Sequence, residues 1–215
     1  QLSNILNIVE KNGMKDNSIF IYAADHGYSG KYSLYQKGIK IPLIMRWPDK
    51  IKPGSKSNSL LTIVDVLPTL VEIAGGSSYD FDGKSFLPIL ENKKIEVNEY
   101  IYGVATRQNV QSTFVFPSRM VSNGKFKLIR NYNSFEVYSK NLTKNNAINH
   151  FIEIGAKKFK RIPFEELYNL EKDPYEKNNL AKNKEYKDIK NDLLLKLNDW
   201  MADQNDFVGV GKMPL

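Results

Sequence analysis

An aspartate and a histidine follow directly on an apolar run near the start of the chain. Residues 18–24 read Ser-Ile-Phe-Ile-Tyr-Ala-Ala, which is typical of a buried strand, and Asp25 and His26 come next. In an open α/β sheet, ligands bind just beyond the carboxyl ends of the strands. A carboxylate and an imidazole at such a point are potential metal ligands. An aspartate there can also cap a turn, so the local pattern leaves both interpretations open.

Two glycines and a lysine follow this pair. Gly27 and Gly30 let the backbone turn tightly and approach a ligand closely. Lys31 comes five residues after His26 and can return a cation toward the same point. We therefore interpret residues 25–31 as a candidate metal site with a cationic side chain nearby.

The elements around this site indicate an α/β domain. Residues 2–12 carry apolar side chains at helical spacing, and Gly13 stands where a helix C-cap is expected. The continuous apolar run at 18–24 predicts a strand buried on both faces, hence a parallel sheet covered by helices. A second β-rich run, 39–47, contains Pro42, which indicates an edge, a bulge or the first residue of a strand.

A loop and a helix are followed by a region of short β-rich runs. Residues 49–59 are rich in serine and lysine with a Pro-Gly pair, which predicts a surface loop. Thr62 or Asp65 can cap a following helix if Pro68 lies in its first turn. Beyond residue 90, short β-rich runs predict antiparallel strands. A final helix is indicated by apolar residues at helical spacing: Ile189, Leu193, Leu197, Trp200 and Met201.

Composition narrows the class of protein. The chain has 215 residues, of which 41% are hydrophobic, so it can bury a core. It has no cysteine, which excludes disulfides, thiolate metal sites and thiol nucleophiles within these residues. The net charge of +7 suits an anionic partner, but the lysines are scattered among asparagines, which favours a solvated surface over a nucleic-acid site. No run is long and apolar enough to predict a membrane span, and no targeting signal is visible.

Three stretches, in this order, resemble the sulfatase family of the alkaline phosphatase superfamily. The first contains DHG, GK and WP within residues 16–54. The second is DVLPTL at 65–70 with DGKSFLP at 82–88. The third is ELYNL, DPYE and NLA within 166–181, which is similar to the signature of the sulfatase carboxy-terminal subdomain. The nearest members are those similar to heparan N-sulfatases and arylsulfatases.

The resemblance implies a fold and a set of site residues. It implies an alkaline-phosphatase-like sheet portion at 1–95, followed at 96–215 by a small antiparallel-sheet subdomain with a carboxy-terminal helix. Asp25 and His26 would bind a divalent cation, usually calcium in this family, and Lys31 would contact the sulfate group. His26 stands where asparagine is commoner, and because calcium prefers oxygen ligands, an imidazole suits zinc or manganese better.

The nucleophile of the resembled family is missing from these residues. Sulfatases use a formylglycine made from the cysteine or serine of a Cys/Ser-x-Pro-x-Arg motif. Residues 115–119, VFPSR, imitate that motif, but Val115 has no heteroatom at the reacting position. We therefore expect the nucleophile, and the rest of the metal site, in an upstream half of the enzyme, and we expect this chain to be inactive alone. By resemblance to heparan N-sulfatase-like members Arg119 could face the substrate, but we interpret it as a strand-surface arginine. We interpret His150 as a loop residue and the Asn-Leu-Thr triplet at 141–143 as a chance glycosylation match.

The function that this resemblance implies is hydrolysis of a sulfate ester or sulfamate, on a sulfated glycan. One alternative is a phosphodiesterase or phosphoglycerol transferase of the same superfamily, in which Asp-His-Gly binds zinc. Another is a binding module that keeps the fold without catalysis. The resemblance also implies a periplasmic or secreted location.

Overall fold

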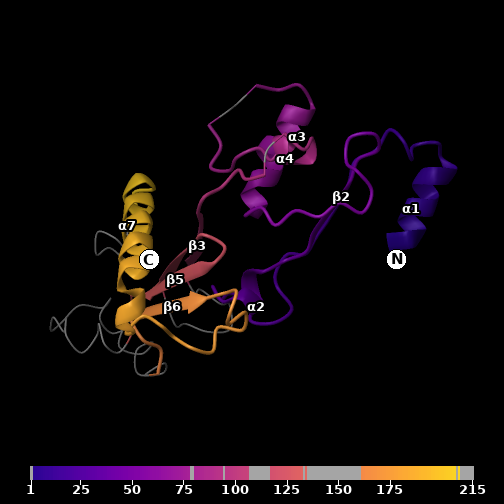
Figure 1. The fold of residues 1–215 in the computed structure, drawn as a ribbon. Coiled ribbons are helices and arrows are strands. Elements are labelled where there is room, and N and C mark those ends of the chain that lie inside the picture. Colours follow the sequence, from indigo (N-terminus) through magenta and orange to yellow (C-terminus); the bar gives the residue numbers. More distant parts are fainter. Residues whose placement is uncertain are drawn as a thin grey trace. The chain divides into compact units, whose positions relative to one another are not determined.

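The computed structural model describes residues 2–77, 80–93, 95–106, 117–132, 134, 161–206 and 208. Val115, His150 and the triplet at 141–143 lie outside the described residues. The chain divides into two compact units (Figure 1). The amino-terminal unit comprises residues 1–26 and 41–99, and the carboxy-terminal unit comprises residues 27–40 and 100–215. The stretch 27–40, which carries Lys31, therefore folds with the carboxy-terminal unit; the division at residue 95 stays a prediction.

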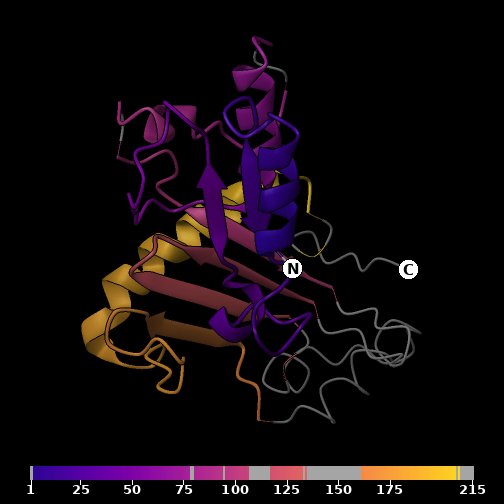
Figure 2. The same cartoon turned by 90° about the vertical axis from the view of Figure 1, so that its right-hand side faces the viewer.

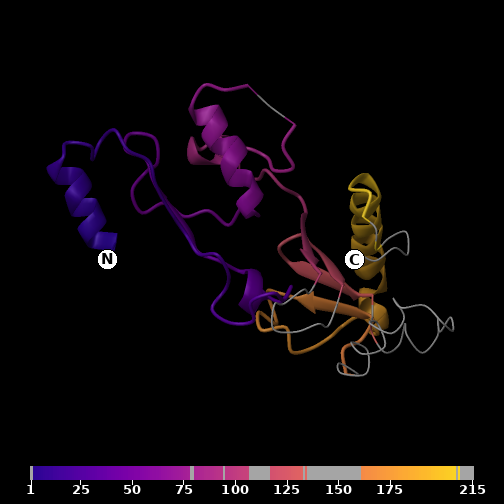
Figure 3. The same ribbon diagram turned by 180° about the vertical axis from the view of Figure 1, so that it is seen from behind.

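The amino-terminal unit begins with a helix, drawn in indigo beside the N-terminus in Figure 3. A two-stranded ribbon follows it. Helix α1 spans Leu2–Lys11 and ends as expected, because Gly13 has a φ of 69° and donates its N–H to the Glu10 carbonyl at 3.0 Å. Strand β1 (Phe20–Ala23) pairs with β2 (Leu43–Arg46), which begins directly after Pro42. Pro42 thus lies one position before the strand, next to the first strand position, which was one of the three places that we predicted for it.

Among the described residues, the strand that pairs with β1 is antiparallel to it, whereas we expected a parallel neighbour. In the pairing of β1 with β2, Phe20 lies opposite Arg46 and Ala23 opposite Leu43. Tyr22 keeps 47% of its surface exposed. A two-stranded ribbon has too few neighbours to cover either of its faces, so apolar composition alone did not reveal the local pairing.

The rest of this unit is helical and organised by a buried aspartate. A 3-10 turn at Ile63–Asp65 leads into α3 (Val66–Ile73), and α4 spans Leu87–Leu90. Asp65 is 1% exposed, and its carboxylate accepts the backbone N–H groups of Thr62 and Lys84, each at 2.8 Å. The expected capping by Thr62 and Asp65 is confirmed.

The carboxy-terminal unit is built on a four-stranded antiparallel sheet (Figure 2). The strand order is β3-β4-β5-β6, which confirms the expected antiparallel sheet. The strands are β3 (Ile101–Ala105), β4 (Ser118–Ser122), β5 (Phe126–Asn131) and β6 (Glu165–Asn169). Helix α7 (Lys187–Asp203) is the expected final helix, and α2 (Gln36–Ile39) lies within the 27–40 stretch.

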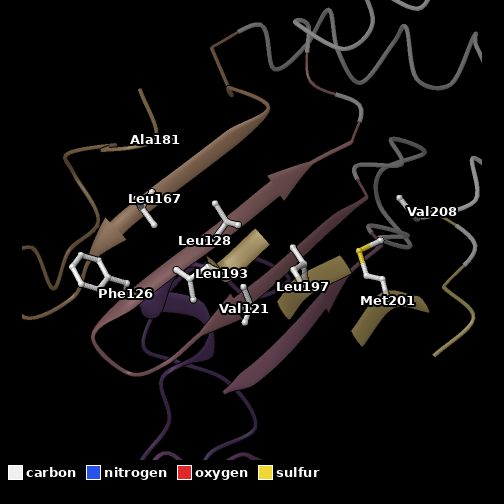
Figure 4. Packing of buried hydrophobic residues seen from close by; sticks show 9 residues of the cluster. All are labelled: Val121, Phe126, Leu128, Leu167, Ala181, Leu193, Leu197, Met201 and Val208. Atoms are coloured by element: carbon white, nitrogen blue, oxygen red, sulfur yellow. The ribbon is translucent and has the colours of Figure 1, made fainter. Parts of the chain in front are cut away.

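The sheet is covered on both faces. Alternate residues of β4, β5 and β6 pack against α7, and Figure 4 shows this apolar cluster: Val121, Phe126, Leu128, Leu167, Ala181, Leu193, Leu197, Met201 and Val208. On the other face, Leu34 from the 27–40 stretch packs with Met120, Ile129 and Tyr168. Strand alternation therefore separates two cores, one under the helix and one under the 27–40 stretch.

Arg119 is not the surface arginine that we expected. It lies on the face of β4 that packs toward α7 and is 1% exposed. Its Nη2 donates to Asp206 Oδ1 at 3.0 Å, just after α7 ends. Burial acts to raise the pKa of Asp206, but hydrogen bonds from Arg119 and from the Val208 N–H outweigh it and hold that pKa below its ordinary value. The arginine is buried because the carboxylate after α7 pairs with it.

Among the described helices, none combines the length and the apolar character needed to cross a membrane.

Candidate functional site

The two expected metal ligands follow the carboxyl end of β1. Asp25 and His26 follow the last strand residue, Ala23, after one intervening alanine. Asp25 Oδ2 and His26 Nε2 lie 3.6 Å apart. Donor atoms that each sit about 2.0–2.6 Å from one ion can be this far apart, so a single cation can contact both. Asp25 is 74% and His26 37% exposed, which leaves the donors accessible.

The donor chemistry fits a divalent cation only in part. The Asp25 carboxylate suits calcium, whereas the His26 imidazole suits a transition metal or zinc. Calcium takes about six to eight oxygen ligands, and a zinc site in a protein takes three or four protein ligands. Among the described residues, no group of three or more histidine, aspartate or glutamate side chains is placed to hold a metal. A metal site built on this pair would therefore need further ligands.

Lys31 belongs to a closed loop, which we call the Lys31 segment (residues 27–40). Gly27 donates its N–H to the Gly38 carbonyl at 2.8 Å, and Ser29 donates to the Lys37 carbonyl at 3.0 Å. The two ends of the loop therefore meet. A Cβ on Gly27 would lie 2.3 Å from the Lys37 carbonyl oxygen, so only glycine permits this approach.

Lys31 lies near the tip of this loop. Its side chain is exposed, and its Nζ lies 5.9 Å from the centroid of the Tyr32 ring, within cation–π range. Tyr32 has a φ of 70°, an uncommon value for a residue with a side chain. Asp25 and His26 thus lie together in the amino-terminal unit, whereas Lys31 belongs to the carboxy-terminal unit.

A buried ion pair on the sheet side binds the backbone of the Lys31 segment, and the sequence did not reveal it. Lys127 on β5 contacts Glu176, which follows β6, and their side chains are 1% and 2% exposed. Lys127 Nζ also donates to the Leu34 carbonyl at 2.9 Å, and Glu176 Oε2 accepts the Gln36 N–H at 2.6 Å. Burial lowers the pKa of Lys127, while Glu176 acts in the opposite direction.

A second buried carboxylate, Glu166, binds Tyr35, which lies between Leu34 and Gln36. The Tyr35 hydroxyl donates to both oxygens of Glu166, at 2.9 Å each. Asn131 Nδ2 donates to Glu166 Oε1 at 2.7 Å, and the Tyr168 hydroxyl donates to Oε2. Burial and the adjacent Glu166 raise the pKa of Tyr35 and of Tyr168 above the ordinary tyrosine value, so both hydroxyls stay protonated as donors.

One signal in the sequence could have pointed to these residues. Glu166 and Glu176 both lie in the third stretch of the sulfatase resemblance, in ELYNL and DPYE. Lys127 alternates with Phe126 and Leu128, a pattern that ordinarily indicates a solvent-facing lysine. Here the face that it occupies is covered by the Lys31 segment.

A match to a known family covers all three predicted site residues. A family model described as N-sulphoglucosamine sulphohydrolase, C-terminal, matches residues 24–153, which include Asp25, His26 and Lys31. The chain belongs to this sulfatase family. It is 51% identical over 209 residues to an ulvan-active sulfatase of Formosa agariphila, covering 97% of this chain and 42% of that protein.

Other sulfatases are similar along nearly the whole chain. Identity is 27% over 221 residues with an N-acetylglucosamine-6-O-sulfatase of Bacteroides thetaiotaomicron, covering 95% of this chain and 34% of that protein. A structure solved with its substrate, D-glucosamine-2-N,6-O-disulfate, matches with a TM-score of 0.75 at 27% identity. That match covers 95% of this chain and 38% of the other. The alkaline-phosphatase-like fold with a carboxy-terminal subdomain is thereby confirmed, and the chain spans about two fifths of its sulfatase relatives.

Proposed function

We propose that the protein containing this chain hydrolyses a sulfate ester or a sulfamate on a saccharide. The observation that carries the proposal is the 51% identity to an ulvan-active sulfatase across 97% of the chain. Sulfated polysaccharide of the ulvan type is therefore the first substrate to test. The surplus of basic residues, +7 overall, is compatible with a polyanionic substrate.

In this proposal Asp25, His26 and Lys31 each contribute to binding the sulfate group. Asp25 and His26 hold a divalent cation together with ligands outside these 215 residues. The cation, when bound, supplies charge neutralisation and orientation at the sulfate oxygens. Calcium is the first candidate, and His26 makes zinc or manganese the alternatives. The Lys31 ammonium contacts a further sulfate oxygen and stabilises negative charge as the ester bond breaks.

The nucleophile belongs to another part of the same enzyme. The family resemblance implies a formylglycine, and none of the 215 residues provides the Cys/Ser-x-Pro-x-Arg motif. The proposal therefore assigns this chain the roles of binding the metal and the sulfate. A periplasmic or secreted location, where an extracellular polysaccharide would be reached, is part of the same proposal.

The test is product analysis with the full-length protein. Purified enzyme is incubated with ulvan and, separately, with N-acetylglucosamine 6-sulfate, and inorganic sulfate is measured by ion chromatography. We expect metal-dependent sulfate release that a chelator abolishes. A phosphodiester substrate serves as the control: its efficient hydrolysis without any sulfate release would favour the phosphodiesterase alternative, and no turnover of either would favour a binding module.

A further inference from the structure

Three consecutive residues of the Lys31 segment are each held by a buried polar group of the sheet. Lys127 binds the Leu34 carbonyl, Glu166 binds the Tyr35 hydroxyl, and Glu176 binds the Gln36 N–H. The three holding side chains are between 1% and 4% exposed. They come from β5, β6 and the turn after β6, more than ninety positions along the chain from the residues that they hold.

This arrangement specifies one position of the backbone. The ammonium donates to a main-chain carbonyl and the carboxylate accepts a main-chain N–H. Between them the Tyr35 side chain is bound by Glu166, and a shift of the segment by one residue would break that contact. Glu176 itself has a φ of 54°, a costly conformation for a residue with a side chain. Two buried charged groups and a residue with positive φ thus fix the backbone of residues 34–36. These residues are followed directly by Lys37 and Gly38, whose carbonyls close the loop around Lys31.

Stability alone does not account for such a pair. Burying two charges costs several kcal/mol each before their attraction is counted, and apolar residues of similar size often do as well or better by about 1–4 kcal/mol. The sheet already has apolar contacts to this segment through Leu34. The ion pair adds directional contacts to main-chain groups, which apolar packing cannot provide.

We propose that the Lys127–Glu176 ion pair positions Lys31. By fixing the backbone of the Lys31 segment, it keeps the Lys31 ammonium in the place from which it contacts the sulfate group. The inference rests on the proposed role of Lys31 in sulfate hydrolysis. Lys127 and Glu176 act through the backbone of residues 34–36 and are positioning residues. Residues 96–215 thereby contribute to the active site through Lys127 and Glu176.

The decisive variant removes the ion pair without leaving one charge buried. Full-length enzyme carrying Lys127→Met with Glu176→Leu is compared with wild type, each with and without Lys31→Ala. Because a misplacement of about 1 Å can cost roughly 100-fold, we expect kcat/KM for sulfate release to fall about tenfold or more in the presence of Lys31. In the Lys31→Ala background the same change should cost less than about twofold, since residues that act as a unit are not additive.

A matched control comes from an exposed pair beside the same two strands. Lys125 Nζ and Glu171 Oε2 lie 3.0 Å apart, and their side chains are 54% and 59% exposed. Lys125→Met with Glu171→Leu should leave kcat/KM within about twofold of wild type, because exposed ion pairs contribute little. Glu176→Gln, which keeps the volume, provides a second variant if the double substitution folds poorly.

Hydrogen exchange gives a readout that does not depend on activity. In the double variant, amides of residues 27–40 should exchange faster while those of β5 and β6 keep their protection. Faster exchange spread equally over the sheet, wild-type activity, or an equal loss of activity in the Lys31→Ala background would each overturn the inference. Failure of the proposed function looks different: wild type would release no sulfate, or Lys31→Ala alone would have no effect.

Discussion

Lys127 and Glu176 form a buried ion pair in which each partner also binds a main-chain group of the Lys31 segment. The lysine lies on a strand of the carboxy-terminal sheet, and the glutamate lies in the DPYE stretch after the last strand. This pairing gives the third stretch of the sulfatase resemblance a physical role. The stretch reaches back to the loop that carries the sulfate-contacting lysine of the proposed site.

The closed shape of the Lys31 segment depends on Gly27. In Gly27→Ala the new Cβ would lie 2.3 Å from the Lys37 carbonyl oxygen, a backbone atom that the loop closure fixes. We expect a loss of about 1–3 kcal/mol in the free energy of unfolding, as for other overpacked sites. Urea denaturation of the full-length protein measures it. Ser29→Ala, an exposed position in the same segment, is the control and should be close to neutral.

The Arg119–Asp206 pair predicts a pH dependence of stability. The pKa of Asp206 is held below its ordinary value of 3.8, so its contribution is fully present above that value and is lost as the pH falls through the lower, folded-state pKa. Asp206→Asn leaves the buried Arg119 charge without an opposite charge at residue 206, which costs about 3–5 kcal/mol at neutral pH. The difference between variant and wild type should shrink below pH 3.8 in unfolding experiments followed by circular dichroism. A difference that stays constant from neutral pH into acid would contradict this assignment.

The proposed metal ligands predict a change in metal content. Asp25→Asn removes the carboxylate charge from the donor pair at the end of β1, so metal should bind more weakly. Elemental analysis of the purified full-length protein, before and after dialysis, compares the two. Asp203→Asn, an exposed position in α7, is the matched control and should keep the wild-type content. Equal metal in Asp25→Asn and wild type would remove Asp25 from the site, and two zinc ions per chain would support the phosphodiesterase alternative.

Local patterns in the sequence predicted the three longest described helices, α1, α3 and α7, but not the single turns α2 and α4. The apolar spacing of α7, the C-cap at Gly13 and the cap formed by Thr62 and Asp65 all depend on residues within a few positions of one another. Such signals are readable because they involve one element at a time. Asp25 and His26 were predicted as candidate ligands in the same way, because they follow the end of an apolar run. They lie close together because they are neighbours in the chain.

Contacts between distant segments could not be read in this way. Lys127 and Glu166 stand on strands where alternation predicts solvent, and only the covering Lys31 segment makes that face an interior. The bond from Lys127 to Leu34 joins residues 93 positions apart. Arg119 was misjudged for the same reason, because its partner Asp206 follows a helix that covers the other face. The antiparallel pairing of β1 also depended on a partner, not on its own composition.

The most direct test of the account is sulfate release by the full-length enzyme with Lys31→Ala. Loss of one charged contact to the reacting group should lower kcat/KM for ulvan about 100-fold or more, with the fold and Tm unchanged because Lys31 is exposed. Lys52→Ala, at an exposed position in the 49–59 loop, is the control and should retain wild-type turnover. Wild-type kcat/KM in Lys31→Ala would contradict the account, because the loop that the sheet holds so tightly would then carry no part of the active site.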